Sequence, residues 1–320
     1  MTVSANNYRL KVTTWANKSK RIVTGKKIKQ VAQTENLTGT EMRITMQISF
    51  EVFPPKKDGN FETAFAVVKR LSELKPEFIS VTYGAGGSKA GKTLEIASYI
   101  QRECDTQAVA HLTCVGSTRQ EILERCREFE ERGITHVLAL RGDRPRDMSD
   151  EKYDAREFGY ATDLIRFLKE NSNLHLLAAC YPEKHFEAKS LEQDLHYMKE
   201  KQELGVEGFI SQMFFENRCF EEFLNKAQQM GIRKPVHAGL MPITSANQLG
   251  TSVSLSGSSV PKELSDLIAR FGDSPEEMYK VGIDYAVRQI LGLKEQGVEG
   301  VHIYTMNKPQ VAEDIWRNIC

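Results

Sequence analysis

The chain has 320 residues, enough for one α/β barrel of about 250 residues with an extension, or for two smaller domains. Hydrophobic residues make up 40% of it, which suits a large core. Formal net charge is zero, but residues 1–41 hold eight Lys and Arg against two acids, so residues 42–320 carry about −6. Binding to a phosphate backbone needs clustered basic residues, so we expect no nucleic-acid partner.

Six scattered cysteines without C-x-x-C spacing predict reduced thiols in a cytoplasmic protein. No apolar run approaches the roughly 18 residues of a membrane helix, so we expect no membrane span. Residues 1–41 lack the apolar segment of a secretory signal and are expected to form a loose basic extension. A transit peptide, a docking arm for a partner protein and a translation start placed too far upstream are the alternatives for this segment.

From residue 47 onward, apolar β-forming runs alternate with segments of helical period, which predicts βα units and a parallel sheet. The expected strands are 47–53, 77–83, 108–115, 136–140, 175–180, 208–214, 236–241 and 301–304. The expected helices are 61–74, 92–102, 118–132, 160–170, 188–204, 217–230, 261–271, 275–296 and 309–319. Three segments are expected to be loops: the glycine-rich 84–87, the long 144–158 and the serine-rich, mobile 252–259.

Eight strand–helix units favour a single closed (β/α)8 barrel, a TIM barrel, over residues 42–320, with extra helices between strands 7 and 8. The strands read as nearly continuous apolar runs, as strands buried on both faces do. An open doubly wound sheet is the alternative fold. It is disfavoured because the first strand–helix loop lacks the G-x-G-x-x-G fingerprint of dinucleotide-binding sheets.

Polar residues gather where the expected strands end, which is where barrel enzymes place their active sites. These candidates are Glu51, Thr82, Tyr83, His111, Arg141, Gly142, Asp143, Tyr181, Glu183, His185, Gln212, Tyr304 and Lys308. Burial would raise the pKa of Glu51 and suit it to act as a general acid. Each residue also has a purely structural interpretation. Glu51 would form a salt bridge with a neighbouring Lys or Arg, Asp143 would cap the next turn, and His111 would be a hydrogen-bonded histidine of the core.

Two further patterns concern ligands. The seven histidines show no H-x-x-x-H or H-E-x-x-H spacing, and His175 and His185 flank one strand end without a clear third ligand, so we expect no metal site. Asp194, Tyr197 and Lys201 share one helix face after the fifth strand. This face is either a solvent-exposed stripe or a surface that meets a ligand.

Seven strings at seven strand ends resemble the methylenetetrahydrofolate reductase family, in the family's order, over about residues 45–320. These strings are ISFEVFPPK, FISVTYGAGGS, AHLTCVG, LALRGDRP, AACYPEKH, GFISQMFF and YTMNK. The first 41 residues are expected to lie outside the resemblance. It is closest to the bacterial form that consists of the catalytic domain alone.

The resemblance implies a barrel that holds FAD at its C-terminal face. The implied cofactor-binding residues are Thr82, His111, Leu140, Arg141, Gly142, Asp143, Tyr160, Ala161, Tyr181, His185, Asp194 and Lys201. Among these, the cationic groups suit a pyrophosphate, which an Arg can grip through two hydrogen bonds.

The implied reaction is reduction of 5,10-methylenetetrahydrofolate to 5-methyltetrahydrofolate, by ping-pong hydride transfer through flavin N5. Glu51 would donate a proton to the folate, and the charge of Asp143 would stabilise positive charge on it and disfavour an anionic reduced flavin. Gln212 would bind the pterin, and Tyr304 and Lys308 would face the folate tail. Such an enzyme serves one-carbon metabolism, either in methionine biosynthesis or in acetogenesis.

Two departures from the bacterial enzymes bear on the electron donor. Ala246 aligns with an aromatic residue that stacks on donor and folate, and Lys308 stands where those enzymes have Arg. NADH, NADPH and a partner electron-transfer protein therefore all remain possible electron donors. The sequence is compatible both with a homo-oligomer and with a hetero-complex. The alternative functions are a catalytic subunit served only by a partner, a flavin- or folate-binding sensor and a different flavin barrel.

Overall fold

The computed structural model describes residues 46–55, 60–83, 90–145 and 147–320. The chain divides into two units, Met1–Arg43 and Ile44–Cys320. The expected basic extension and the glycine-rich loop at 84–87 both lie outside the described residues.

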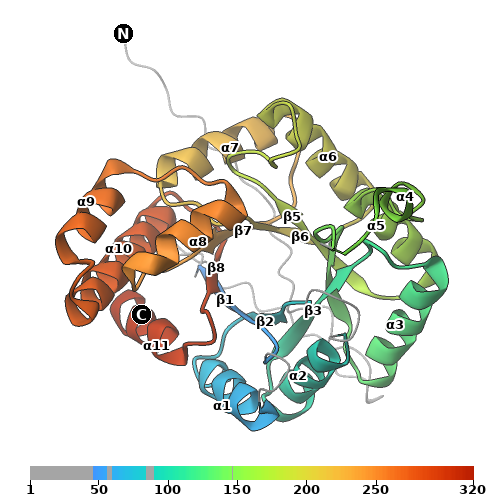
Figure 1. Ribbon diagram of the computed structural model, residues 1–320, viewed down its shortest axis with the longest axis horizontal. Coiled ribbons are helices and arrows are strands. Elements are labelled where there is room, and N and C mark those ends of the chain that lie inside the picture. The colour runs from blue at the N-terminus through green and yellow to red at the C-terminus, as the bar shows by residue number, and fades with distance from the viewer. Residues whose placement is uncertain (1–45, 56–59, 84–89, 146) are drawn as a thin grey trace, which may run out of the picture. The chain divides into compact units, whose positions relative to one another are not determined.

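Eight parallel strands pair in chain order, and the last pairs with the first, so the sheet closes into a barrel. The strands lie at the centre with helices around them (Figure 1). They are β1 Gln47–Val52, β2 Phe78–Val81, β3 Gln107–Thr113, β4 His136–Leu140, β5 His175–Cys180, β6 Gly208–Ser211, β7 Val236–Leu240 and β8 Gly300–Tyr304. The expected (β/α)8 barrel is thus confirmed, and the open sheet is excluded because no edge strand remains.

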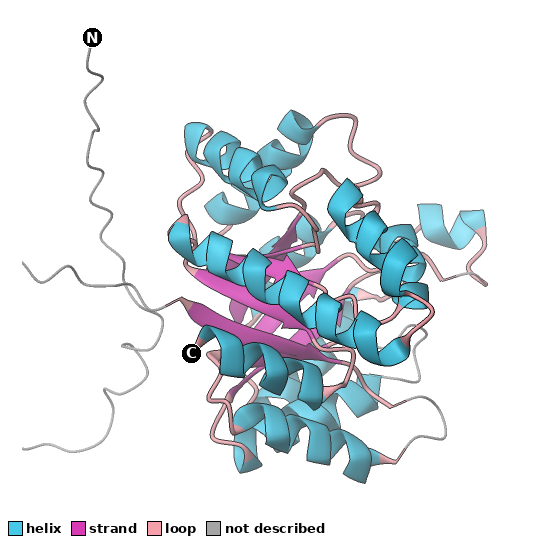
Figure 2. Cartoon of the chain, turned by 90° about the vertical axis from the view of Figure 1, so that its left-hand side faces the viewer, coloured by secondary structure: helices cyan, strands magenta, loops and turns pink. Residues whose placement is uncertain are grey.

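The described residues form eleven helices, and Figure 2 shows helices surrounding the strands. They are α1 Phe61–Ser72, α2 Ala90–Glu103, α3 Arg119–Glu131, α4 Asp150–Asp154, α5 Ala161–Asn171, α6 Leu191–Glu203, α7 Asn217–Gln229, α8 Ala246–Ser256, α9 Lys262–Phe271, α10 Pro275–Glu295 and α11 Pro309–Ile319. Local signals start several of them. Thr118 and Glu121 form a capping box at α3, and α10 and α11 begin with proline, whose missing N–H costs nothing there.

Two segments expected to be loops contain a helix. Within 144–158, Ser149 accepts a hydrogen bond from the Lys152 amide and starts the short helix α4. The serine-rich 252–259 is largely taken up by α8, which ends at Gly257 with a φ of 69°. Serine is only a weak helix former, so its run suggested a loop, but burial of Ser252 and packing of Leu249 and Val253 stabilise the helix.

Two apolar clusters hold the barrel together. The larger lies between the strands and the surrounding helices. The smaller contains Met213, Phe215, Ile243, Leu264 and Met278, and it anchors the extra helices α8, α9 and α10 between strands 7 and 8. These helices therefore form part of the barrel's own packing.

All six cysteines are free, as expected. Cys114, Cys126 and Cys180 are buried, whereas Cys320 is exposed. Within the described part of the chain, no helix is both long and apolar enough to cross a membrane.

Candidate active site

Glu51 is the polar centre of the barrel's C-terminal face. It pairs in register with Ser80 on β2 and Tyr304 on β8. Its side chain is only 19% exposed. Burial raises the pKa of the Glu51 carboxyl, while His111 and a hydrogen bond with Ser80 act in the opposite direction. The carboxyl therefore holds its proton more strongly than an exposed glutamate does.

His111, on β3, lies beside Glu51 on the inner side of the barrel. Its Nε2 lies 3.4 Å from Oε2 of Glu51, and its side chain is 8% exposed. Burial lowers the pKa of His111 to about 4, so the ring is neutral at pH 7. Nε2 is buried and forms no hydrogen bond within the described residues. Since buried polar atoms are rarely left unpaired, this nitrogen is suited to a ligand on the C-terminal face.

Below Glu51, a chain of buried polar groups runs into the barrel. Ser80 Oγ lies 3.2 Å from His302 Nε2, and His302 Nδ1 lies 2.8 Å from Ser49 Oγ. Ser49 Oγ is in turn 3.3 Å from His237 Nδ1. Burial lowers the pKa of both histidines to about 3, so both rings are neutral. The search for polar residues at strand ends did not find these residues. Ser49 could have been found, because side chains two positions apart in a strand point to the same side, so Ser49 and Glu51 together indicate a polar inner face of β1.

The loop after β8 fixes the end of β1. Thr305 Oγ1 donates to the Glu51 carbonyl at 2.8 Å. The Asn307 side chain accepts from the Phe53 amide at 2.9 Å and donates to the Phe53 carbonyl at 2.8 Å. Asn307 has a φ of 54°, a left-handed conformation that asparagine tolerates better than most residues. These two side chains were also missed, and they hold the backbone on both sides of Val52.

A second group of candidates meets where β4 and β5 end. Arg141 Nη2 donates to Glu187 at 2.8 Å, and this pair is the largest cause of the raised pKa of Arg141. Tyr181 and His185 rings contact edge to face at 4.8 Å. Asp194 Oδ2 accepts from the His185 amide at 2.8 Å and so fixes the loop after β5.

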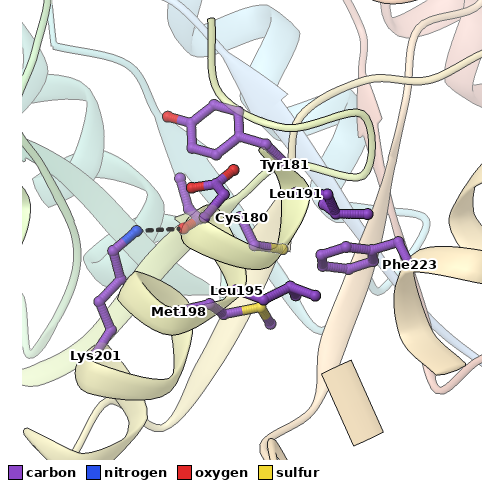
Figure 3. Close-up of a pocket in the computed structure, with 9 residues that line it drawn as sticks. Cys180, Tyr181, Leu191, Leu195, Met198, Lys201 and Phe223 are labelled. Atoms are coloured by element: carbon purple, nitrogen blue, oxygen red, sulfur yellow. Dashed lines mark hydrogen bonds between the residues drawn. The ribbon is translucent and has the colours of Figure 1, made fainter. Parts of the chain in front are cut away.

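Lys201 lies in a small pocket between β5 and α6. Its Nζ donates to the Ala179 carbonyl at 2.9 Å, and it points from α6 toward the end of β5 (Figure 3). The pocket is lined by Ala179, Cys180, Tyr181, Leu191, Asp194, Leu195, Met198, Lys201 and Phe223. Lys201 is buried, whereas Tyr197 is 41% exposed and stacks on Tyr160 at 6.3 Å. The helix face is therefore divided: Asp194 and Lys201 line the pocket, and Tyr197 does not.

The other cofactor candidates lie on the same face of the barrel. Leu140 ends β4, and Gly142 follows with a φ of 84°. Only glycine fits this turn, because a Cβ at position 142 would come within 2.9 Å of Thr113 Cβ. Asp143 is exposed, and Ala161 is the first residue of α5. Thr82, directly after β2, is half-buried, and its carbonyl accepts from Thr93 Oγ1.

Two of the three substrate candidates already form hydrogen bonds within the protein. Gln212 Oε1 accepts from the Met213 amide at 2.9 Å. The Tyr304 hydroxyl donates to the Ser211 carbonyl at 2.7 Å. Lys308 is exposed at the start of α11.

Two histidines expected to flank the same strand end lie at opposite ends of β5. His175 is the first residue of the strand, and His185 follows its other end. The expectation that they flank one strand end is therefore wrong, because a six-residue strand is about 20 Å long.

Comparison with known proteins places the chain among relatives of one kind. A family model described as "Methylenetetrahydrofolate reductase" matches residues 12–320. The expectation that the first 41 residues stand outside the resemblance is therefore wrong for residues 12–41. Proteins called 5,10-methylenetetrahydrofolate reductase from Pectobacterium carotovorum and Escherichia coli are 32% and 31% identical over 277 residues. Those alignments cover 87% of this chain and 91% and 92% of the relatives.

A plant relative, "Methylenetetrahydrofolate reductase (NADH) 1" of Arabidopsis thaliana, is 32% identical over 85% of this chain and 48% of its own length. Among solved structures, a Clostridium thermocellum protein described as binding two copies of 5-methyl-5,6,7,8-tetrahydrofolic acid matches with a TM-score of 0.56 at 14% identity. That match covers 87% of this chain and 95% of the other, and it concerns the fold alone. The extent of the family match and the identity to the bacterial relatives show that this chain belongs to the methylenetetrahydrofolate reductase family.

Proposed function

We propose that this protein reduces 5,10-methylenetetrahydrofolate to 5-methyltetrahydrofolate with FAD as its cofactor. The observation that carries the proposal is Glu51, a buried carboxyl of raised pKa beside the neutral ring of His111 on the barrel's C-terminal face. The names of the bacterial relatives support the substrate. Reduction of such a folate needs a proton donor near neutral pH, and this carboxyl has the properties of one.

The residues present fit FAD. His111 Nε2 is a buried atom without a hydrogen bond among the described residues, and it lies 3.4 Å from Oε2 of Glu51. Arg141 and Lys201 would supply positive charge for a pyrophosphate. Arg141 would exchange its partner Glu187 for phosphate oxygens, and Lys201 its partner, the Ala179 carbonyl. The Glu187 side chain is 42% exposed, so water can hydrate its carboxylate when Arg141 leaves it. When bound, FAD supplies the hydride chemistry, and the protein supplies position and electrostatics.

Glu51 would act in the folate half of the reaction. Its carboxyl would donate its proton to the folate nitrogen that leaves the one-carbon bridge. Thr305 and Asn307 hold the backbone around Glu51, which fixes the direction of that donation. His111 does not take this proton at pH 7, because burial lowers its pKa to about 4.

Other residues of the same face would orient the substrate. Gln212 would hydrogen-bond the pterin, with its amide held by the Met213 backbone. Tyr304 and Lys308 would face the folate tail, and Lys308 lies exposed where a carboxylate of that tail could reach it. Asp143 would place a negative charge near the pterin and the flavin.

The region after β7 favours a second candidate, a subunit reduced only by a partner protein. Ala246 begins α8, and a Cβ placed on Gly272 would lie 3.1 Å from the Ala246 Cβ. Ala246 therefore packs tightly against the α9–α10 connection. Alanine at this position offers no aromatic ring for stacking on a nicotinamide.

One anaerobic experiment separates the two candidates. The purified protein is mixed with NADH, then with NADPH, and bleaching of the flavin's visible absorbance is followed. Bleaching by either, reversed by 5,10-methylenetetrahydrofolate, supports a self-sufficient reductase and identifies its donor. Bleaching by neither, with reoxidation by the folate after chemical reduction, favours the partner-dependent subunit. Failure of the folate to reoxidise chemically reduced flavin contradicts both.

A further inference from the structure

Three metal-ligating side chains meet at the barrel end opposite the candidate active site. His136 is the first residue of β4, His175 is the first residue of β5, and Glu207 directly precedes β6. Their potential ligand atoms all lie within 4.8 Å of one another. Among the described residues, this is the one such group of three. We propose that His136, His175 and Glu207 bind a divalent transition-metal ion, with Zn²⁺ as the best match to the donors.

The backbone holds these three residues in place. His136 and His175 are direct partners in the β4–β5 register, so their side chains leave the sheet on the same side. The His175 amide donates to Thr135 O at 2.8 Å, and the Glu207 amide donates to Leu176 O at 2.8 Å. Because adjacent strands of the closed barrel supply the ligands, the protein does not have to fold further to assemble the site.

The three side chains lie close together, and rotation of the two rings would point one nitrogen of each at a shared ion. The two imidazole rings stack with centroids 4.6 Å apart and planes 15° apart. His175 Nδ1 lies 2.6 Å from Glu207 Oε1. Thr135 Oγ1 lies 2.8 Å from His136 Nδ1, the kind of outer contact that orients a metal-ligating ring.

The donor set indicates the type of ion. Two imidazoles and one carboxylate are typical of zinc, with water as the fourth ligand. Calcium and magnesium prefer sites made of oxygen atoms.

The position of the site indicates its role. In barrels of this type the N-terminal face of the strands serves stability, and the reaction takes place at the other face. An ion held here would join the beginnings of β4, β5 and β6. It is expected to stabilise the fold and to leave the reaction unaffected, so the proposal stands apart from the proposed function.

The test uses the full chain without a histidine tag, stripped of metal by a chelator. Calorimetry with Zn²⁺ and visible absorption with Co²⁺ are expected to show one ion per chain. Zn²⁺ at a hundredfold excess over its Kd is expected to raise Tm by about 5 °C. His175→Ala and Glu207→Gln, both at partly exposed positions, should each weaken binding at least tenfold and abolish the rise in Tm.

Two control variants exclude other ligands. His196→Ala removes an exposed histidine outside the group, and Cys320→Ser removes the exposed thiol. Both should bind Zn²⁺ and Co²⁺ as the parent does. Equal binding by the parent, His175→Ala and Glu207→Gln would overturn the proposal, and so would the absence of binding by the parent.

Discussion

At the scale of single residues, the properties of Glu51 follow from its neighbours on three other strands. Ser80 donates to it from β2, neutral His111 faces it from β3, and His302 lies 3.9 Å away on β8. Burial outweighs the two favourable contacts, so the pKa of the carboxyl is raised. A carboxyl adjusted in this way remains available as a proton donor where an exposed glutamate would be ionised.

Glu51→Gln is expected to abolish the folate half-reaction and to leave flavin binding intact. Glutamine preserves the shape but has no acidic proton, so reoxidation of reduced flavin by the folate should slow by about 10²–10⁴-fold. Stopped-flow absorbance measures each half-reaction separately. Glu77→Gln is the control, since Glu77 also has a pKa raised by burial but lies before β2, at the opposite end of the barrel. Equal loss of both half-reactions would remove Glu51 from the acid role.

Asp143→Asn is expected to raise the flavin's reduction potential. Loss of a negative charge near the cofactor favours the electron-rich reduced form, with a shift on the order of 30 mV, about 1.4 kcal/mol for two electrons. The folate step should slow as well. Spectroelectrochemistry measures the potential, and Asp150→Asn, at an exposed position in α4, is the control. An unchanged potential would rule out the electrostatic role of Asp143.

At the scale of elements, α8, α9 and α10 cover the barrel between β7 and β8. Gly282 of α10 lies so close to the β7–α8 connection that an added Cβ would be 2.0 Å from the Ile243 carbonyl. Gly250 of α8 faces open space. Two helical glycines of this region thus serve different purposes, one for close packing and one without a packing role.

The same substitution should therefore have opposite effects at the two positions. Gly282→Ala forces α10 away from Ile243 and is expected to destabilise the fold by about 2–3 kcal/mol. Gly250→Ala is expected to stabilise it by up to about 1 kcal/mol, because alanine is the better helix former. Urea unfolding measures both. Stabilisation by Gly282→Ala would contradict the close packing of α10.

At the scale of the whole molecule, the barrel encloses neutral histidines. The pKa of His111 is lowered to about 4, and those of His237 and His302 to about 3, in each case chiefly by burial. In the unfolded chain these groups take up protons below about pH 6.5. Their contribution to stability is complete above that pH and is lost as the pH falls toward the folded values.

Acidification from pH 7 to 5 should therefore lower the free energy of unfolding, by about 2 kcal/mol for each of these histidines. Glu51 acts in the opposite direction, since its raised pKa favours the folded state in acid. Urea unfolding at pH 7, 6 and 5 measures the slope. His237→Gln should make the slope shallower, whereas His196→Gln, on the surface, should not. A parent protein equally stable at pH 5 and 7 would disprove this account.

The sequence alone was sufficient to predict the barrel and to predict which of its faces carries the candidate site. Alternation of apolar strands and helices is local, and the rule that barrel sites lie at strand ends brought Glu51, His111 and Arg141 together without coordinates. The weak helix propensity of serine led to a wrong expectation for α8, where packing outweighs it. Local propensity gave no sign of α4, whose cap lies in a segment that lacks an apolar period.

Tertiary structure decided which of these side chains meet. Ser49, Ser80 and His302 come from three strands, and only the register of the closed barrel brings them beneath Glu51. The same holds for His136, His175 and Glu207, which no sequence spacing joins. Motifs reveal ligands that share one helix or loop. Ligands from adjacent parallel strands are about 30–40 residues apart in this chain and come into contact only when the sheet forms, because hydrogen bonds between strands set their register.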